Sequence, residues 1–283
     1  MKIIQSISEM KEFSRAAGQE GKTVGLVPTM GALHAGHLSL LGYARDLCDI
    51  SVMSVFVNPT QFGPAEDFAK YPRDLAKDSV LAESAGCDAV FAPSVEEMYP
   101  EGYNTYIDAG PVGDALCGAS RPGHFRGVAT VVMKLFNIVS PAAAVFGAKD
   151  AQQVAVIKSV VKDLNIPVKI ITAPIVREPD GLAMSSRNAY LTPGERKQAV
   201  NISKALFEAK SLFDKGERSS DRIKESIVSI INGGGGLIQM EYAEIVDPVS
   251  LRPLNRIDNT ALIAVACRTL ESRTRLIDNV VAG

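Results

Sequence analysis

The chain has 283 residues, a net charge of −2 and 46% hydrophobic residues. This composition is typical of a folded protein with one large domain or two unequal ones, and it argues against a disordered chain or a nucleic-acid-binding protein. Four scattered cysteines, no run near the ~20 apolar residues of a membrane span, and no secretion signal predict a cytoplasmic protein without membrane contacts.

Short apolar runs in the first part of the chain predict the strands of one sheet. They lie at residues 23–27, 50–57, 89–92, 143–146 and 168–172. Segments of helical pattern separate most of these runs, and the clearest is a core helix over residues 128–139, with apolar side chains at i, i+3, i+4 spacing. This alternation predicts a doubly wound, Rossmann-like parallel sheet of the α/β class.

The pattern changes after Pro174. Thr192-Pro193-Gly194-Glu195 forms a capping box with proline at the first helical position and predicts a helix toward Lys210. A second helix near residues 221–231 ends in a run of glycines, and three strand candidates follow close together. These strands, at residues 238–246, 261–266 and 274–277, predict a small, mainly antiparallel sheet. We therefore expect a Rossmann-like domain over residues 1–175 and a smaller α+β C-terminal domain over residues 176–283.

Two histidines follow the first predicted strand, where it gives way to a helix. His34 and His37 are three residues apart, so they share one helix face if the first turn includes both. Free backbone N–H groups at a helix start bind anions, and Gly36 lets a ligand approach the backbone. Residues 28–37 therefore predict a nucleotide-phosphate site.

Two other interpretations of this pair stay open. The histidines can be surface residues that only begin a helix. A zinc site is the other rival, but neither a nearby His or Cys nor a C-x-x-C motif completes a tetrahedral set, since the remaining histidine is His124.

Polar residues also follow the second predicted strand and precede the core helix. Asn58 and Gln61 lie at the carboxyl end of the sheet, where they can bind hydroxyls or a carboxylate; the alternative is a polar turn around Pro59. Residues 120–127, which include Arg121, form a loop suited to anions or simply a solvated basic loop.

Two later segments have charge and hydroxyl groups suited to phosphate. Lys149 follows the fourth strand and can bind phosphate oxygens, while Asp150 and Gln153 can instead form a variant capping box. Met184-Ser185-Ser186-Arg187 lies between Gly181 and Asn188 and is expected to be a mobile loop that clamps a polyphosphate.

Together these motifs, in this order, resemble the pantoate–β-alanine ligase family of the HIGH-motif nucleotidyltransferase superfamily, from one end of the chain to the other. The matching stretches are residues 27–37, 56–62, 120–127, 147–150 with Gln153, and 184–188. One departure is Ala148, where an acidic or amide residue often precedes the lysine.

The resemblance implies an ATP-dependent reaction in two steps. Pantoate attacks the α-phosphate of ATP to give pantoyl adenylate and pyrophosphate, and the amine of β-alanine then displaces AMP to give pantothenate. It also implies a homodimer, Mg²⁺ carried mainly by the ATP phosphates with no protein metal site, and closure of the C-terminal domain as a lid that excludes water.

The same resemblance implies a role for each matching residue. The catalytic groups are His34, His37, Lys149 and Arg187. The ATP-binding residues are Met30, Gly31, Ala32, Leu33, His34, Ala35, Gly36, His37, Gly147, Ala148, Lys149, Asp150, Val176, Met184, Ser185, Ser186 and Arg187. Pantoate binds Gln61, Gln153 and Arg121, and β-alanine binds Gln61 and Asn58.

Two alternatives of other function remain. A cytidylyl- or adenylyltransferase of the same superfamily would use the histidine loop, but Gln61, Gln153 and Arg121 suit a small hydroxy acid instead. A non-catalytic nucleotide-binding protein is a third option, weakened because the charged groups that the chemistry needs are present.

Overall fold

A computed structural model describes residues 1–64 and 66–283, which divide into two compact units. The first unit consists of Met1–Asp114, Gly118–Ala148 and Val156–Pro174. The second unit consists of Ala115–Cys117, Lys149–Ala155 and Ile175–Gly283. Residues 115–117 and 149–155 therefore belong to the second unit, although a single boundary after residue 175 would assign them to the first.

The elements alternate between strand and helix up to Pro174. In order they are β1 (Lys2–Ile4), α1 (Ile7–Gln19), β2 (Val24–Thr29), α2 (Ala35–Leu47), β3 (Ile50–Val55), η1 (Pro59–Gln61), η2 (Asp67–Ala69), α3 (Leu75–Ser84), β4 (Ala89–Phe91), α4 (Val95–Met98), α5 (Pro111–Asp114), α6 (Cys117–Ser120), α7 (His124–Val139), β5 (Ala143–Gly147), η3 (Ala148–Asp150), α8 (Ala151–Asp163) and β6 (Lys169–Ala173).

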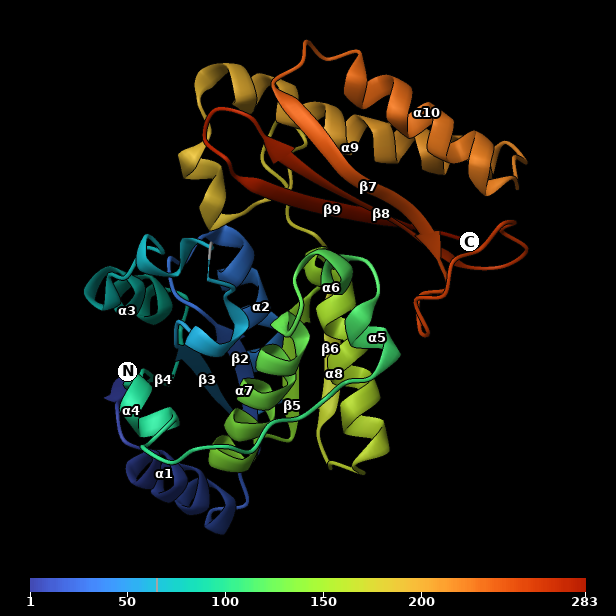
Figure 1. Ribbon diagram of the computed structural model, residues 1–283. Coiled ribbons are helices and arrows are strands. Elements are labelled where there is room, and N and C mark those ends of the chain that lie inside the picture. Colours follow the sequence, from blue (N-terminus) through green and yellow to red (C-terminus); the bar gives the residue numbers. More distant parts are fainter. Residues whose placement is uncertain (65) are drawn as a thin grey trace. The chain divides into compact units, whose positions relative to one another are not determined.

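The strands of the first unit form one parallel sheet in the order β1-β4-β3-β2-β5-β6 (Figure 1). Helices flank it, and α2 packs against β2, β3 and β5. The core between α2 and the sheet includes Val27, Leu41, Met53 and Val90, all with fully buried side chains. The prediction of a Rossmann-like α/β sheet is confirmed.

The strand order reverses next to β2. The chain passes from β2 to β3 and β4 on one side, and then places β5 and β6 on the other side. Open parallel sheets bind their ligands outside the carboxyl ends of the strands at such a reversal. The two loops that start there are the histidine loop after β2 and the segment 147–150 at the end of β5.

The second unit contains a three-stranded antiparallel sheet and two long helices. From Ile175 onward the elements are η4 (Ser186–Tyr190), α9 (Pro193–Asp214), α10 (Ser220–Asn232), β7 (Ile238–Val246), β8 (Ala261–Thr269) and β9 (Arg275–Ala282). The sheet order is β7-β8-β9, and α9 and α10 pack on each other. A core of Ile202, Leu206, Ile223, Ile227 and Ile263 fills the unit.

Several elements differ from the sequence prediction in length or were not predicted. Helix α7 begins at His124 rather than residue 128, and β9 runs to Ala282. Strand β1 and helix α1 were not predicted, although Ser6 caps α1 by accepting a hydrogen bond from the Glu9 amide in a pattern readable from the sequence. Among the described residues, no helix has the length and apolar character needed to cross a membrane.

The predicted capping box at the start of α9 is confirmed, and its glutamate holds a second segment. The Thr192 side chain accepts from the Glu195 amide, and Glu195 Oε2 accepts from the Thr192 amide at 3.0 Å. Glu195 Oε1 also accepts from the amides of Glu271 and Ser272, at 2.8 and 2.9 Å. Burial raises the pKa of Glu195, but the hydrogen bonds from Ser272, Thr192 and Glu271 outweigh it and lower the pKa to about 2.

We expect Glu195→Gln to lower the free energy of unfolding by about 1–3 kcal/mol at pH 7, because the amide group would place N–H against a backbone N–H. The pKa in the folded state lies below the ordinary value of 4.5, so this stabilisation is complete above pH 4.5 and is lost as the pH falls toward about 2. Urea unfolding at several pH values measures both effects. Glu208→Gln, exposed on the same helix, is the control, and an equal loss in both variants contradicts the prediction.

Candidate active site

His34 is the N-cap residue of α2. Its backbone is extended, and its Nδ1 accepts a hydrogen bond from the Gly36 amide at 3.1 Å. A nitrogen that accepts from an N–H carries no proton, so the proton of the neutral imidazole lies on Nε2. His34 therefore starts the helix and keeps an N–H donor on the other side of its ring.

The structure brings His34 and His37 together. Their rings stack with centroids 4.0 Å apart and an angle of 29° between the planes. This contact follows from their positions, with His34 at the cap and His37 in the first turn. Two imidazoles in this arrangement can approach one anionic ligand.

The expectation of free amides in this loop is wrong for several residues. The Gly31 amide donates to Thr29 Oγ1 at 3.2 Å. The amides of Ala32 and Leu33 donate to the carboxylate of Asp78, at 2.9 and 2.8 Å. Together with the Gly36 amide, these donors already have acceptors within the protein, on α3 for Ala32 and Leu33 and within the loop and its flanks for Gly31 and Gly36. The imidazoles, rather than these amides, are the groups of this loop suited to a phosphate.

Asn58 and Gln61 lie at the two ends of η1, directly after β3. Asn58 is buried and donates to Gln61 Oε1 at 3.0 Å and to the Gly127 carbonyl at 3.2 Å. Its Oδ1 accepts from the Tyr99 hydroxyl at 2.9 Å and from the Thr60 amide and hydroxyl. Asn58 thus holds the turn and the side chain of Gln61 in place, and its binding of β-alanine stays a prediction.

The amide nitrogen of Gln61 faces Met30 of the histidine loop. Gln61 Nε2 donates to Met30 Sδ at 3.3 Å. A thioether is a weak acceptor, so a carboxylate or hydroxyl can take over this donor at little cost. The structure therefore holds this donor beside the loop after β2, on a buried side chain that Asn58 fixes.

Gly127 allows η1 to pack against α7. A Cβ at position 127 would overlap the backbone carbonyl of Thr60 and lie 2.8 Å from the backbone nitrogen of Gln61. Only glycine fits at this position without displacing the turn that carries Gln61.

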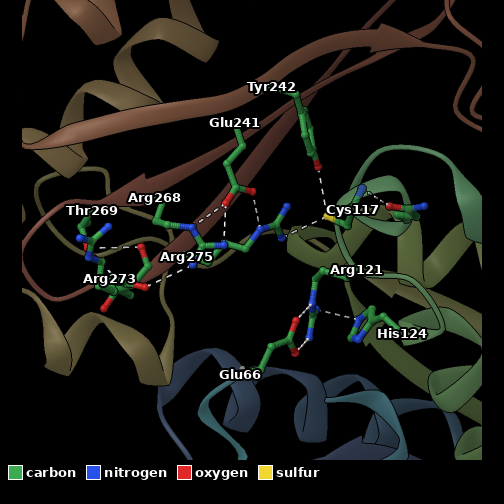
Figure 2. A network of polar contacts seen from close by, with 12 residues as sticks. Glu66, Cys117, Arg121, His124, Glu241, Tyr242, Arg268, Thr269, Arg273 and Arg275 are labelled. Atoms are coloured by element: carbon green, nitrogen blue, oxygen red, sulfur yellow. Dashed lines mark hydrogen bonds and ion pairs between the residues drawn. The ribbon is translucent and has the colours of Figure 1, made fainter. Parts of the chain in front are cut away.

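Arg121 is held by Glu66 and His124 (Figure 2). Its Nε and Nη2 donate to the two Glu66 oxygens, at 2.7 and 2.5 Å. Burial raises the pKa of Glu66, but Arg121 outweighs it and lowers that pKa below its usual value. His124 Nδ1 lies 2.7 Å from the Gln61 carbonyl oxygen, which can only accept, so Nδ1 carries the proton and Nε2 accepts from Arg121. Arg121 is thus part of a structural network, and its binding of pantoate stays a prediction.

In the second unit, Lys149 and Asp150 form a 3-10 turn that leads directly into α8. Lys149 Nζ lies 3.8 Å from Asp150 Oδ2. Asp150 is the last residue of this turn, so the helix continues from it and does not start at an extended capping residue. The turn itself is anchored by Asn279, whose side chain donates to the Lys149 carbonyl at 3.0 Å.

The two glutamines at the start of α8 differ in their surroundings. Gln152 is buried, accepts from the Cys117 amide at 2.9 Å and donates to the Ala115 carbonyl at 2.5 Å. It thereby attaches residues 115–117 to the second unit. Gln153 is half-buried, so it is the more exposed residue of the pair.

The segment 184–187 runs into a short 3-10 helix, where the sequence predicts a loop. The Met184 amide donates to the Val176 carbonyl at 3.0 Å, which brings two predicted ATP-binding residues together. Ser185 caps η4 by accepting from the Arg187 amide at 3.3 Å. Asn188 donates to Glu178 and to the Ala183 carbonyl. Ser186 and Arg187 therefore lie in a short helix that Ser185 caps, and the sequence pattern did not predict this cap.

Two of the cysteines, Cys87 and Cys267, are poorly suited to act as nucleophiles. Burial raises the pKa of Cys87 to about 11 and that of Cys267 to about 12, so both stay protonated thiols. Cys117 lies within the second unit beside the Tyr242 hydroxyl and Arg275 (Figure 2). Across residues 1–64 and 66–283, no three His, Cys, Asp or Glu side chains gather as in a metal centre.

Four of the polar residues that shape these groups belong to none of the sequence motifs: Glu66, Asp78, Tyr99 and Gln152. Tyr99 reaches Asn58 from 41 positions away in the sequence, and Asp78 reaches the histidine loop from 45 or 46. No local pattern marks such partners, because their significance depends on which loop they face.

Comparison with known proteins supplies the family. A sequence model described as pantoate-beta-alanine ligase matches residues 2–281. The chain belongs to the pantoate–β-alanine ligase family. It is therefore an enzyme of the ligase class, as the motifs predicted.

Relatives match along the full chain. A pantothenate synthetase of Acetivibrio thermocellus is 56% identical over 281 residues, 99% of each chain. The crystal structure of pantothenate synthetase from Thermus thermophilus has a TM-score of 0.92 at 43% identity and covers 99% of each chain. The pantoate-beta-alanine ligase of Francisella tularensis, solved with beta-gamma ATP and beta-alanine, has a TM-score of 0.80 at 34% identity and covers 99% of this chain and 97% of its own.

We expect Gly127→Ala to lower the free energy of unfolding by about 1–3 kcal/mol, because the added methyl group overpacks the contact between α7 and η1. Gly42→Ala is the matched control. Gly42 lies inside α2 with no atom within 4 Å of an added Cβ, so this change should be neutral or stabilise by up to about 1 kcal/mol. Urea unfolding of both variants is the measurement, and similar effects at the two positions would refute the close approach.

Proposed function

We propose that this chain condenses pantoate with β-alanine to pantothenate in two steps at the expense of ATP. In the first step an oxygen of the pantoate carboxylate bonds to the α-phosphorus and the bond to the leaving pyrophosphate breaks. In the second step the amine of β-alanine attacks the acyl carbon, AMP leaves, and the amine loses a proton. The full-length family match and the ATP and β-alanine bound to the Francisella relative support this proposal.

The observation that carries the proposal is the pair of stacked imidazoles at the start of α2. The first step brings one anion to another and spreads negative charge over the phosphate. His34 presents its Nε2–H and His37 stacks on it, so we propose that both stabilise the charge at the reacting phosphate. A fixed donor of this kind acts on the transition state without reorganising.

The second unit is proposed to act on the same ATP. Lys149 and Arg187 supply positive charge and Ser185 and Ser186 supply hydroxyls, while Val176 meets the adenine end with its main chain. The guanidinium of Arg187 suits bidentate contact with phosphate oxygens. Support for Val176 comes from its hydrogen bond to Met184, which joins two segments of the predicted site.

Pantoate is proposed to bind through Gln61, Gln153 and Arg121, and β-alanine through Gln61 and Asn58. The fixed amide of Gln61, held by Asn58 and facing a thioether, supports its role. The greater exposure of Gln153 than of Gln152 supports the choice between these neighbours. Because Arg121 forms an ion pair with Glu66, its guanidinium would have to bind the carboxylates of Glu66 and pantoate at the same time.

The remaining proposals concern the rest of the ATP site, Mg²⁺, the location and oligomeric state of the enzyme, and its domains. We propose that residues 30–37 and 147–150 complete the ATP site and that Mg²⁺ reaches it mainly on the ATP phosphates, in line with the few protein ligands this ion takes. We also propose a cytoplasmic homodimer with a nucleotide- and pantoate-binding domain over residues 1–175. The remaining domain, residues 176–283, is proposed to act as a lid that keeps water from the adenylate.

Exchange of labelled pyrophosphate into ATP tests the two-step reaction. Purified enzyme with ATP, Mg²⁺ and pantoate is expected to exchange label without β-alanine, because the adenylate forms first. Addition of β-alanine should then yield equal amounts of AMP and pantothenate. Exchange that needs β-alanine would exclude the ordered two-step reaction, and label entering ATP without pantoate would indicate a different substrate.

One substitution can separate the capping role of His34 from its proposed chemical role. Asparagine is among the best N-cap residues, so His34→Asn should keep α2 and the free energy of unfolding while it removes the imidazole. We expect pyrophosphate exchange to fall roughly 10²-fold, as for the loss of one fixed donor at an active site. Exchange rates and urea unfolding are measured on the same preparation. Full exchange activity in the asparagine variant would leave His34 with the capping role alone.

A further inference from the structure

Asp78 is a buried carboxylate that holds the histidine loop. It lies on α3 with 2% of its surface exposed. Its Oδ2 accepts from the Ala32 amide at 2.9 Å, and its Oδ1 accepts from the Leu33 amide at 2.8 Å. Both of its oxygens therefore bind the backbone just before His34.

The loop that Asp78 holds is strained. Gly31 has φ +80° and Ala32 has φ 50°, both in the left-handed region. A residue with a side chain such as Ala32 rarely adopts this conformation unless its surroundings impose it. A Cβ at position 31 would lie 2.7 Å from Asp78 Oδ2 and 3.1 Å from Val55 Cγ1, so the carboxylate and the loop backbone pack directly on each other.

The negative charge of Asp78 indicates that this position needs the hydrogen-bonding geometry of a carboxylate. A carboxylate beside a loop that meets triphosphate repels the ligand, which would favour a neutral residue here. A carboxylate, however, accepts with both oxygens and donates with neither. Asparagine offers one oxygen, and its NH₂ group would face the second backbone N–H.

We infer that Asp78 is a positioning residue for the adenylation step. By accepting both amides it sets the backbone of residues 31–33, and so the place at which His34 and His37 meet the reacting phosphate. The inference rests on the proposed function. It adds a residue on α3 that touches neither substrate nor phosphate and acts through the loop.

The test compares Asp78→Asn with Asp88→Asn. Asp88 also accepts two hydrogen bonds, from the Ser51 amide and hydroxyl at 2.8 Å each, but it lies at the amino end of β4. In a parallel sheet this is the opposite edge from the histidine loop. Asp88 is exposed and both bonds end on its Oδ2, which the amide oxygen of Asn can replace, so Asp88→Asn controls for the change from carboxylate to amide without changing the loop.

We expect Asp78→Asn to lower the turnover of pantoate-dependent pyrophosphate exchange about 10- to 100-fold per folded molecule, because small misplacement of a catalytic group is costly. The KM for pantoate should change by less than about twofold, since its proposed ligands lie elsewhere. Asp88→Asn should keep turnover within about twofold of the wild type. Equal turnover in the two variants, or a loss carried only by the KM for pantoate, would overturn the inference.

Two further measurements keep the test decisive. If Asp78→Asn does not fold, Gly31→Ala displaces the same carboxylate from the loop side and should reproduce the loss of turnover. If the wild type shows no pantoate-dependent exchange, the proposed function fails, and amide hydrogen exchange of residues 31–37 then tests Asp78 alone. That exchange should be at least roughly tenfold faster in Asp78→Asn than in Asp88→Asn; equal protection would refute the positioning role.

Discussion

The reversal of strand order beside β2 is the constraint on which the rest of the site depends. Because all six strands are parallel, their carboxyl ends lie at one edge of the sheet. The loops after β2, β3 and β5 therefore start side by side. They begin with the histidine loop, with Asn58 and with Ala148, so segments far apart in the sequence bring their polar groups to one edge.

The groups proposed to contact ligands depend on buried polar side chains that hold them in place. Asn58 fixes Gln61, Asp78 fixes the histidine loop, and Gln152 fixes residues 115–117. Each of these side chains is buried and forms at least two hydrogen bonds within the protein. An unpaired polar group in such a place costs about 1–3 kcal/mol, which is why each partner must be present in the correct geometry. Pre-organisation of the site is thus built from ordinary hydrogen bonds.

Most features that depend on neighbouring residues were predicted correctly, whereas contacts between distant residues were not. The five apolar runs, the core helix and the capping box of Thr192 depend on side chains a few residues apart, and the structure contains all of them. The amides of Ala32 and Leu33 were expected to be free, and the structure pairs them with Asp78. The segment 184–187 was expected to be a loop, but Ser185 caps a short helix there. Strand β1 has only three residues, too few to show a period.

The sequence by itself determined the fold class, the family and the residue types of the proposed site, because each of these depends on periodicity or on motifs of neighbouring residues. It placed His34 at a strand-to-helix junction, where the chemistry of an N-cap follows directly. Only the tertiary structure decided which donors are already paired, that Arg121 binds Glu66 and His124, and that Asp78 supports the histidine loop. The reason is physical: a buried hydrogen bond between residues 45 apart in the chain is selected by packing, and packing leaves no periodic trace in the sequence.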